Sequence, residues 1–218
     1  RREMFNVCAQ CGLYHADKEI DSVNSVAICP ECGHKYPFRQ LPLLLICGPS
    51  GAGKSTIVRR LSRDITAAVM LEGDILWQSE FAAPEDNHRR FFETWLRVAK
   101  NISQAGRPVV LFIAGALPSN VEPCIERRYF SQTHYLSLVC DNDVLADRLR
   151  QRPSWRESGS EQFINDNIAF NDWLKTNGAQ QTPPLKLLDT TADTIEQSSQ
   201  AVAEWIGRIL SHAHDFPS

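Results

Sequence analysis

The sequence has no long hydrophobic run and no surplus of charge of one sign. None of its apolar stretches approaches the roughly 20 residues that a membrane-spanning helix requires. The net charge of −3 lacks the basic surplus typical of nucleic-acid-binding proteins. No segment has the form of a secretory signal. We therefore expect a cytoplasmic protein with no membrane partner and no nucleic-acid partner.

Two short motifs that mark particular nucleotide hydrolases are also missing. The sequence contains neither N-K-x-D nor T-K-x-D, the stretches that read guanine, which indicates that the protein is not a GTPase. No acidic residue follows the apolar run at residues 109–113, where many ATPases hold their metal ion; the chain there reads Gly115-Ala116-Leu117-Pro118. The signature of transport ATPases is absent as well. These absences argue against a mechanical ATPase.

The most informative feature present is a phosphate-binding loop pattern. Residues 48–55 read GPSGAGKS and match G-x-x-x-x-G-K-[ST]. An apolar run at residues 41–47 precedes the pattern and a helical pattern at residues 56–61 follows it, which is the strand, turn and helix context that the loop needs. Its amides and the helix N-terminus are expected to hold ATP phosphates, with Lys54 reaching the outer phosphates and Ser55 binding Mg²⁺. The expected nucleotide contacts are Gly48, Ser50, Gly51, Ala52, Gly53, Lys54, Ser55 and Thr56.

The rest of the chain alternates short apolar runs with helical patterns. The expected strands lie at residues 41–47, 67–71, 109–113, 135–140 and 185–188. The expected helices lie near residues 54–63, 86–104, 119–130, 142–151, 161–175 and 193–211. This alternation predicts an α/β fold with a five-stranded doubly wound parallel sheet over residues 41–218, and ligands in such sheets bind at the carboxyl ends of the strands.

Four cysteines in the first forty residues form two C-x-x-C-G knuckles. Cys8 and Cys11 are separated from Cys29 and Cys32 by seventeen residues, a spacing typical of zinc sites. Four thiolates leave no position for a catalytic water, so we expect a structural Zn²⁺ in a zinc ribbon over residues 1–40. Two disulfides are the alternative. The balanced charge of this segment favours protein contact, dimerisation or covering of the active site over nucleic-acid binding.

Charged side chains follow two of the expected strands. Glu72 and Asp74 come after the second strand, where one carboxylate can accept a proton from an attacking hydroxyl and the other can hold a magnesium-bound water or a substrate hydroxyl; Asp74 is the favoured base. A polar turn is the alternative. After the fourth strand, Arg148, Arg152 and Arg156 cluster around a polar segment, and Arg152 and Arg156 suit stabilisation of a transferring phosphoryl group. The alternative for the arginines is a solvated basic helix end.

Residues 41–210 resemble the small P-loop kinases, the family of adenylate, shikimate and gluconate kinases and chloramphenicol phosphotransferase. Their D-R-x-x-x-R stretch, which precedes a lid, matches residues 147–152 here and implies a lid around residues 151–162. The resemblance implies that Arg148 stacks on adenine, that Arg152 contacts phosphates and that Asp74 contacts the acceptor hydroxyl. It further implies that the loop Asp189-Thr190-Thr191 edges the adenine, with Thr191 as the expected contact. Two features of this sequence depart from the family. The phosphate loop also resembles that of guanylate kinase, but the GMP-binding segment expected shortly after it is absent here. The zinc ribbon does not occur in the simple members of the small P-loop kinase family.

Residues 75–97 are expected to cap the acceptor. Arg89 or Arg90 can hold an acceptor phosphate or carboxylate, whereas Phe91 and Trp95 have the spacing of core residues. The sequence thus predicts a kinase dependent on ATP and Mg²⁺ that phosphorylates a hydroxyl of a nucleoside-like or other ring-bearing small molecule. Two alternatives stay open: a nucleoside monophosphate kinase, and a nucleotide-switched binding module whose zinc ribbon docks a protein or RNA.

Overall fold

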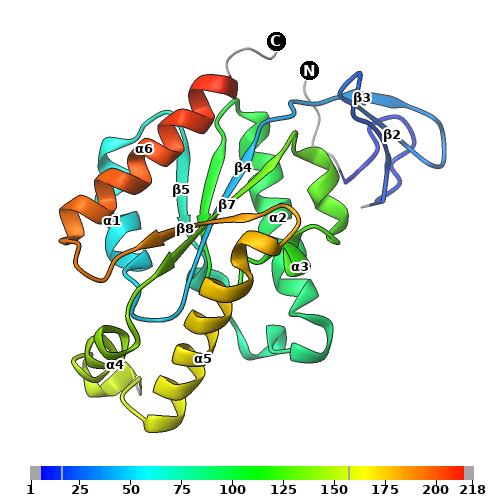
Figure 1. Ribbon diagram of the computed structural model, residues 1–218. Coiled ribbons are helices and arrows are strands. Elements are labelled where there is room, and N and C mark those ends of the chain that lie inside the picture. The colour runs from blue at the N-terminus through cyan, green and yellow to red at the C-terminus, as the bar shows by residue number, and fades with distance from the viewer. Residues whose placement is uncertain (1–5, 16, 157, 214–218) are drawn as a thin grey trace.

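The structure, a computed structural model, describes residues 6–15, 17–156 and 158–213. A parallel sheet with helices on both faces forms the body, and a small antiparallel sheet lies at one end of it (Figure 1). No helix in these ranges is long and apolar enough to cross a membrane.

The five strands of the body confirm the predicted doubly wound sheet. In spatial order they are β5 (Val69–Glu72), β6 (Val109–Phe112), β4 (Leu43–Cys47), β7 (Thr133–Val139) and β8 (Leu185–Asp189), and every neighbouring pair is parallel. Every residue of the central strand β4 is buried, as expected for a strand with helices on both of its faces. Each expected strand end lies within two residues of the observed one.

The helices divide between the two faces of the sheet because successive strand residues point in opposite directions. Leu44 and Ile46 pack with α1 (Lys54–Asp64) and α6 (Ile195–Ala213). Leu43 and Leu45 pack on the other face. The helices on that face are α2 (Arg89–Gln104), α3 (Pro118–Val121) and α5 (Glu161–Asn177), while α4 (Asn142–Arg150) packs against α5.

Two segments differ from the helices that the pattern predicts. The expected helix at residues 119–130 is instead the short α3 followed by the 3₁₀ helix η4 (Ile125–Tyr129), because Pro123 lacks the N–H that a continuous helix needs. The expected helix at residues 86–104 begins only at Arg89. Three 3₁₀ turns precede it: η1 (Gly73–Leu76), η2 (Ser79–Phe81) and η3 (Pro84–Asp86). Two further turns are η5 (Ser154–Arg156) and η6 (Gly178–Gln180).

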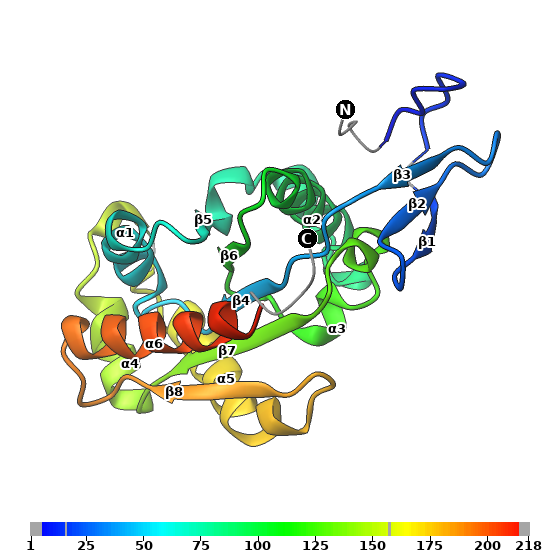
Figure 2. The same cartoon turned by 90° about the horizontal axis from the view of Figure 1, so that it is seen from above.

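The antiparallel sheet and the four cysteines form what we term the cysteine module, residues 6–38. Its strands are β1 (Glu19–Asp21), β2 (Val26–Ile28) and β3 (Lys35–Pro37), paired in that order. The module precedes β4 and lies where that strand begins, whereas α4 lies at the opposite end of the sheet (Figures 1 and 2). The phosphate-loop pattern follows the other end of β4, so the length of the sheet separates the module from it.

Candidate active site

The loop between β4 and α1 has the backbone conformation of a phosphate cradle. Gly48, Gly51 and Gly53 have φ angles of 138°, 93° and 100°, which side-chain-bearing residues rarely adopt. Gly48 is also pressed against β7, since a Cβ there would lie 2.4 Å from the carbonyl oxygen of Leu138. The φ angles of Gly48 and Gly53 explain why the pattern requires glycine at these two positions.

Lys54 lies at the mouth of this loop. Its ammonium donates hydrogen bonds to the carbonyls of Gly48 at 2.6 Å and Pro49 at 2.9 Å. Burial lowers the pKa of Lys54 to about 8, and the nearby carboxylates of Asp74 and Glu72 act in the opposite direction. The cation therefore stands in the field of the two carboxylates predicted to face the loop.

A cavity of about 560 Å³ joins the loop to residues from distant parts of the chain. This volume falls within the range of small-molecule sites. Ten predicted site residues line it: Ser50, Gly51, Ala52, Gly53, Lys54, Ser55, Thr56, Asp74, Arg148 and Arg152. The sequence did not mark several other lining residues as site residues, among them Ala114, Trp155, Asp193, Ile195 and Ser198, whereas Thr190 belongs to the loop predicted to edge the adenine.

Arg148 is fixed against the loop that follows β8. Its guanidinium donates to the Thr190 hydroxyl at 3.2 Å and to the Thr190 carbonyl at 2.8 Å. Thr190 lines the cavity, whereas the neighbouring Thr191, predicted to edge the adenine, is not among the lining residues and donates its hydroxyl to Asp189. The sequence carries no signal that distinguishes these two adjacent threonines.

The segment after α4 contributes Arg152 and Trp155 to the cavity wall. The third predicted arginine, Arg156, ends η5, and its side chain lies outside the described part of the structure.

A further contact ties α5 to the phosphate loop, because the amide of Ser50 donates a hydrogen bond to the Asn167 side chain at 2.8 Å. The Ser50 amide thus has a protein partner as well as a place in the cavity wall.

The two acidic residues after β5 have different surroundings. Asp74 is exposed in η1 and lines the cavity, whereas Glu72 is half-buried as the last residue of β5 and is not among the lining residues. Gly73 lies between them, and its carbonyl accepts a 3.0 Å hydrogen bond from the buried indole of Trp95. A Cβ at Gly73 would come within 2.0 Å of Ile113. The turn that carries Asp74 is thus held from both sides.

The proposed acceptor cap does not bring its arginines to the cavity. Neither Arg89 nor Arg90 is among the lining residues; Arg90 is exposed and Arg89 is half-buried near the Cys124 thiol. Phe91 and Trp95 are buried in the core, as their helical spacing predicts. Trp77 is 47% exposed and packs edge-on against Phe91.

The four cysteines of the module form one cluster. The sulfur atoms lie within 4.8 Å of one another, with 3.6 Å between Cys8 and Cys32 and 3.9 Å between Cys11 and Cys29. Tetrahedral Zn²⁺ with bonds of about 2.3 Å places its sulfur ligands about 3.8 Å apart. The donor set therefore fits zinc in both chemistry and spacing.

The two knuckles also share one backbone pattern. The amide of the first cysteine donates to the carbonyl five residues on, at 2.8 Å for Cys8 and 2.9 Å for Cys29. The glycine after each second cysteine, Gly12 or Gly33, has a positive φ and returns its amide to that first cysteine's carbonyl. This repeated turn places both pairs of thiols at a single point.

Comparison with known proteins decides the family. A protein-family model described as AAA domain matches residues 44–165, more than half of the chain. This chain belongs to the AAA domain family. The matched residues contain the phosphate loop, both carboxylates and the three arginines, and the cysteine module lies outside them. No curated protein matches the sequence.

Solved structures share the fold of this AAA domain. A gluconokinase from Sinorhizobium meliloti 1021 has 16% identity and a TM-score of 0.57, covering 81% of this chain and 98% of its own. A sugar kinase from Janibacter sp. HTCC2649 has 17% identity and a TM-score of 0.55, covering 78% and 95%. The APS kinase of Mycobacterium tuberculosis, solved with AMPPNP and APS, has 15% identity and a TM-score of 0.53, covering 78% and 99%. The predicted resemblance to small P-loop kinases is confirmed at the level of the fold.

Proposed function

We propose that this AAA domain protein is a kinase that uses ATP and Mg²⁺ to phosphorylate a hydroxyl group of a small molecule. The observation that carries the proposal is the shared cavity, where Asp74 faces the same space as Lys54 and Ser55 of the phosphate loop. A carboxylate opposite a phosphate cradle supplies the base that a hydroxyl acceptor needs. The named functions of the sugar kinase and gluconokinase with this fold support a small-molecule acceptor.

The residues of the cavity divide the reaction between them. The loop amides and Lys54 hold the ATP phosphates, Ser55 is the protein ligand for Mg²⁺, and Arg148 with the Thr190–Thr191 loop holds the adenine end. Bound Mg²⁺ neutralises phosphate charge. Asp74 takes the proton of the acceptor hydroxyl. The hydroxyl oxygen of the acceptor then bonds to the γ-phosphorus of ATP, while the bond between that phosphorus and the oxygen that leaves with ADP breaks. Glu72 orients the acceptor, and Arg152 and Arg156 neutralise the transferring group.

The structure also bears on the choice of acceptor. A nucleoside monophosphate kinase would need Arg89 or Arg90 at the acceptor phosphate, and neither lines the cavity. We therefore favour an acceptor without a phosphate group, such as the nucleoside-like or other ring-bearing metabolite that the sequence predicts, over a monophosphate.

We propose a zinc ribbon in residues 1–40 with one structural Zn²⁺ on Cys8, Cys11, Cys29 and Cys32, a kinase domain in residues 41–218 with a lid around 151–162, and a cytoplasmic location. Dimerisation through the ribbon belongs to this proposal and would appear in sedimentation of the full chain. Elemental analysis tests the zinc, and less than half an equivalent in carefully purified protein would contradict it.

The direct test of activity is a screen of nucleosides, sugars and other ring-bearing metabolites for acceptor-dependent ATP consumption. Lys54→Ala is the matched control and should lose nearly all transfer. Turnover by that variant at the wild-type rate would overturn the assignment. Nucleotide-dependent binding of a protein or RNA with no acceptor found would favour the binding-module alternative.

A further inference from the structure

We propose that the cysteine module positions Asp74 from the opposite end of the sheet, through helix α2 and the side chains of Lys100 and Trp95. The inference rests on the proposed role of Asp74 as base and on the metal-binding role of the cysteines. The module would thus affect the reaction by positioning Asp74, although no residue of the module lines the cavity.

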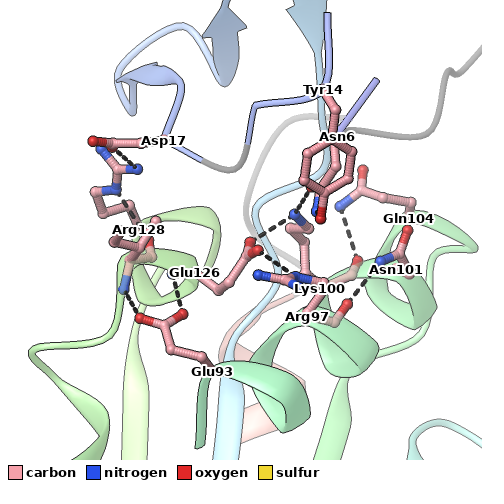
Figure 3. A network of polar contacts seen from close by, with 11 residues as sticks. Asn6, Tyr14, Asp17, Glu93, Arg97, Lys100, Asn101, Gln104, Glu126 and Arg128 are labelled. Atoms are coloured by element: carbon pink, nitrogen blue, oxygen red, sulfur yellow. Dashed lines mark hydrogen bonds and ion pairs between the residues drawn. The ribbon is translucent and has the colours of Figure 1, made fainter. Parts of the chain in front are cut away.

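The first link is a buried polar contact between the module and α2 (Figure 3). The Lys100 ammonium donates to the Asn6 side chain of the module at 3.0 Å and to the Glu126 carboxylate of η4 at 2.6 Å. Arg97, one turn earlier on α2, donates to the other oxygen of Glu126 at 3.0 Å. Lys100 and Glu126 are fully buried, so these groups depend on one another for the contacts that water would otherwise supply.

Two further contacts hold the module on the same elements. Tyr129 of η4 is buried in the hydrophobic core of the module, with its ring 5.1 Å from that of Phe38 and 4.3 Å from the Lys100 ammonium. At the end of α2, Gln104 bonds the backbone of Arg39 twice, at 2.8 Å to its amide and 3.1 Å to its carbonyl. The last turns of α2 are therefore fixed to the module and to the chain leaving it.

The second link connects α2 to the candidate base. Trp95 lies five residues before Lys100, about 7.5 Å along the helix axis. Its indole N–H donates to the Gly73 carbonyl, and Asp74 is the next residue. A displacement of α2 along or around its axis is thus transmitted to the turn that carries the carboxylate.

The proposed coupling depends on the bound metal because the cysteine module is too small to stay folded without it. Its strands have three residues each, and its hydrophobic core includes two of the cysteines themselves. Modules of this size draw most of their folding free energy from a bound structural metal. Loss of zinc should therefore release Asn6 and Phe38 from their partners and loosen α2.

The test is hydrogen–deuterium exchange of the full chain, read over residues 73–76 and 89–104. Removal of zinc, or the substitution Lys100→Met, should speed exchange in both segments by about 3- to 30-fold. Arg128→Met is the matched control, since it removes an exposed contact between the same two parts, the 2.9 Å pair with Asp17. Asn6→Ala leaves the Lys100–Glu126 pair in place and deletes the module's end of the buried contact, together with the exposed 3.3 Å hydrogen bond from Asn6 to the Tyr14 hydroxyl, and gives a milder variant with the same expected direction.

Kinetics supply the second readout. Trp95→Phe keeps an aromatic ring and deletes the N–H that holds Gly73, so kcat should fall by about 10- to 100-fold while the affinity for ATP stays unchanged. Unchanged exchange and unchanged kcat after zinc removal would overturn the inference. The exchange experiment needs no acceptor, so absence of kinase activity would contradict the proposed function and leave the coupling between module and η1 measurable.

Discussion

The ammonium of Lys100 and the carboxylate of Glu126 lie 2.6 Å apart with both side chains fully buried. The Arg60 guanidinium and the Glu196 carboxylate are also 2.6 Å apart, but their side chains are 46% and 75% exposed. The two pairs match in distance and differ in solvent access. They therefore separate the energetic effect of burial from that of contact.

We predict that Glu126→Gln lowers the free energy of unfolding by about 3–5 kcal/mol, because the substitution leaves the buried Lys100 charge without its counter-ion. Glu196→Gln should cost less than about 1 kcal/mol, the range for exposed pairs. Urea unfolding of the two variants, followed by circular dichroism, measures both values. Equal losses of unfolding free energy in the two variants would contradict the prediction that the buried pair contributes more to stability than the exposed pair.

Asp74→Asn tests the proposed base with almost no change in shape. The amide cannot take the proton of the acceptor hydroxyl, so transfer should fall by about 10²–10⁴-fold. ATP affinity should persist, because the phosphate loop is unaltered. Single-turnover transfer and fluorescent-nucleotide binding measure the two quantities, and an equal loss in both would assign Asp74 to nucleotide binding instead.

Gly73→Ala should displace the same turn by steric conflict. Its Cβ would stand 2.0 Å from Cγ1 of Ile113, and that side chain is buried in the core, where it has little room to move aside. We expect a loss of stability of about 1–3 kcal/mol together with reduced transfer. Gly159→Ala, where a Cβ meets nothing within 4 Å, is the control. Ile113→Ala in the Gly73→Ala background should restore part of the transfer rate, as measured by a double-mutant cycle.

ATP affinity should depend on pH through Lys54. Burial lowers its pKa to about 8, so the free protein loses this positive charge as pH rises through 8. A bound phosphate favours the ammonium form, hence binding above pH 8 should take up a proton and affinity should fall. Calorimetry in buffers of different ionisation enthalpy between pH 7 and 9.5 measures the uptake. Lys54→Ala should abolish the dependence, and a flat wild-type profile would contradict the prediction.

Local patterns were enough to predict the sheet and half of the cavity. The phosphate loop is a continuous run of residues, so its pattern of glycines can be recognised in the sequence alone. The alternation of apolar runs and helical patterns predicts the order of strands and helices. Asp74, Arg148 and Arg152 follow strands whose carboxyl ends meet at one edge, so strand positions alone bring them together.

The remaining contacts join residues with no pattern between them. The Asn167 side chain reaches the Ser50 amide across 117 positions, and Lys100 reaches Asn6 across 94. An asparagine or lysine on a helix looks like a solvated surface residue in the sequence. Only the packing of whole helices decides that these particular side chains are buried or bonded.

The place of Tyr129 affects how the protein can be divided. Its ring lies in the same hydrophobic cluster as Cys8 and Cys29, although Tyr129 follows Cys29 by 100 positions and three strands of the main sheet, β4, β5 and β6, come between them in the chain. A fragment ending at residue 40 would carry the four cysteines without this ring, and the complementary fragment would expose it to water. A cut near residue 40 would therefore divide a region that folds together, and the hydrophobic core of the cysteine module is completed by a residue of the AAA domain that follows it.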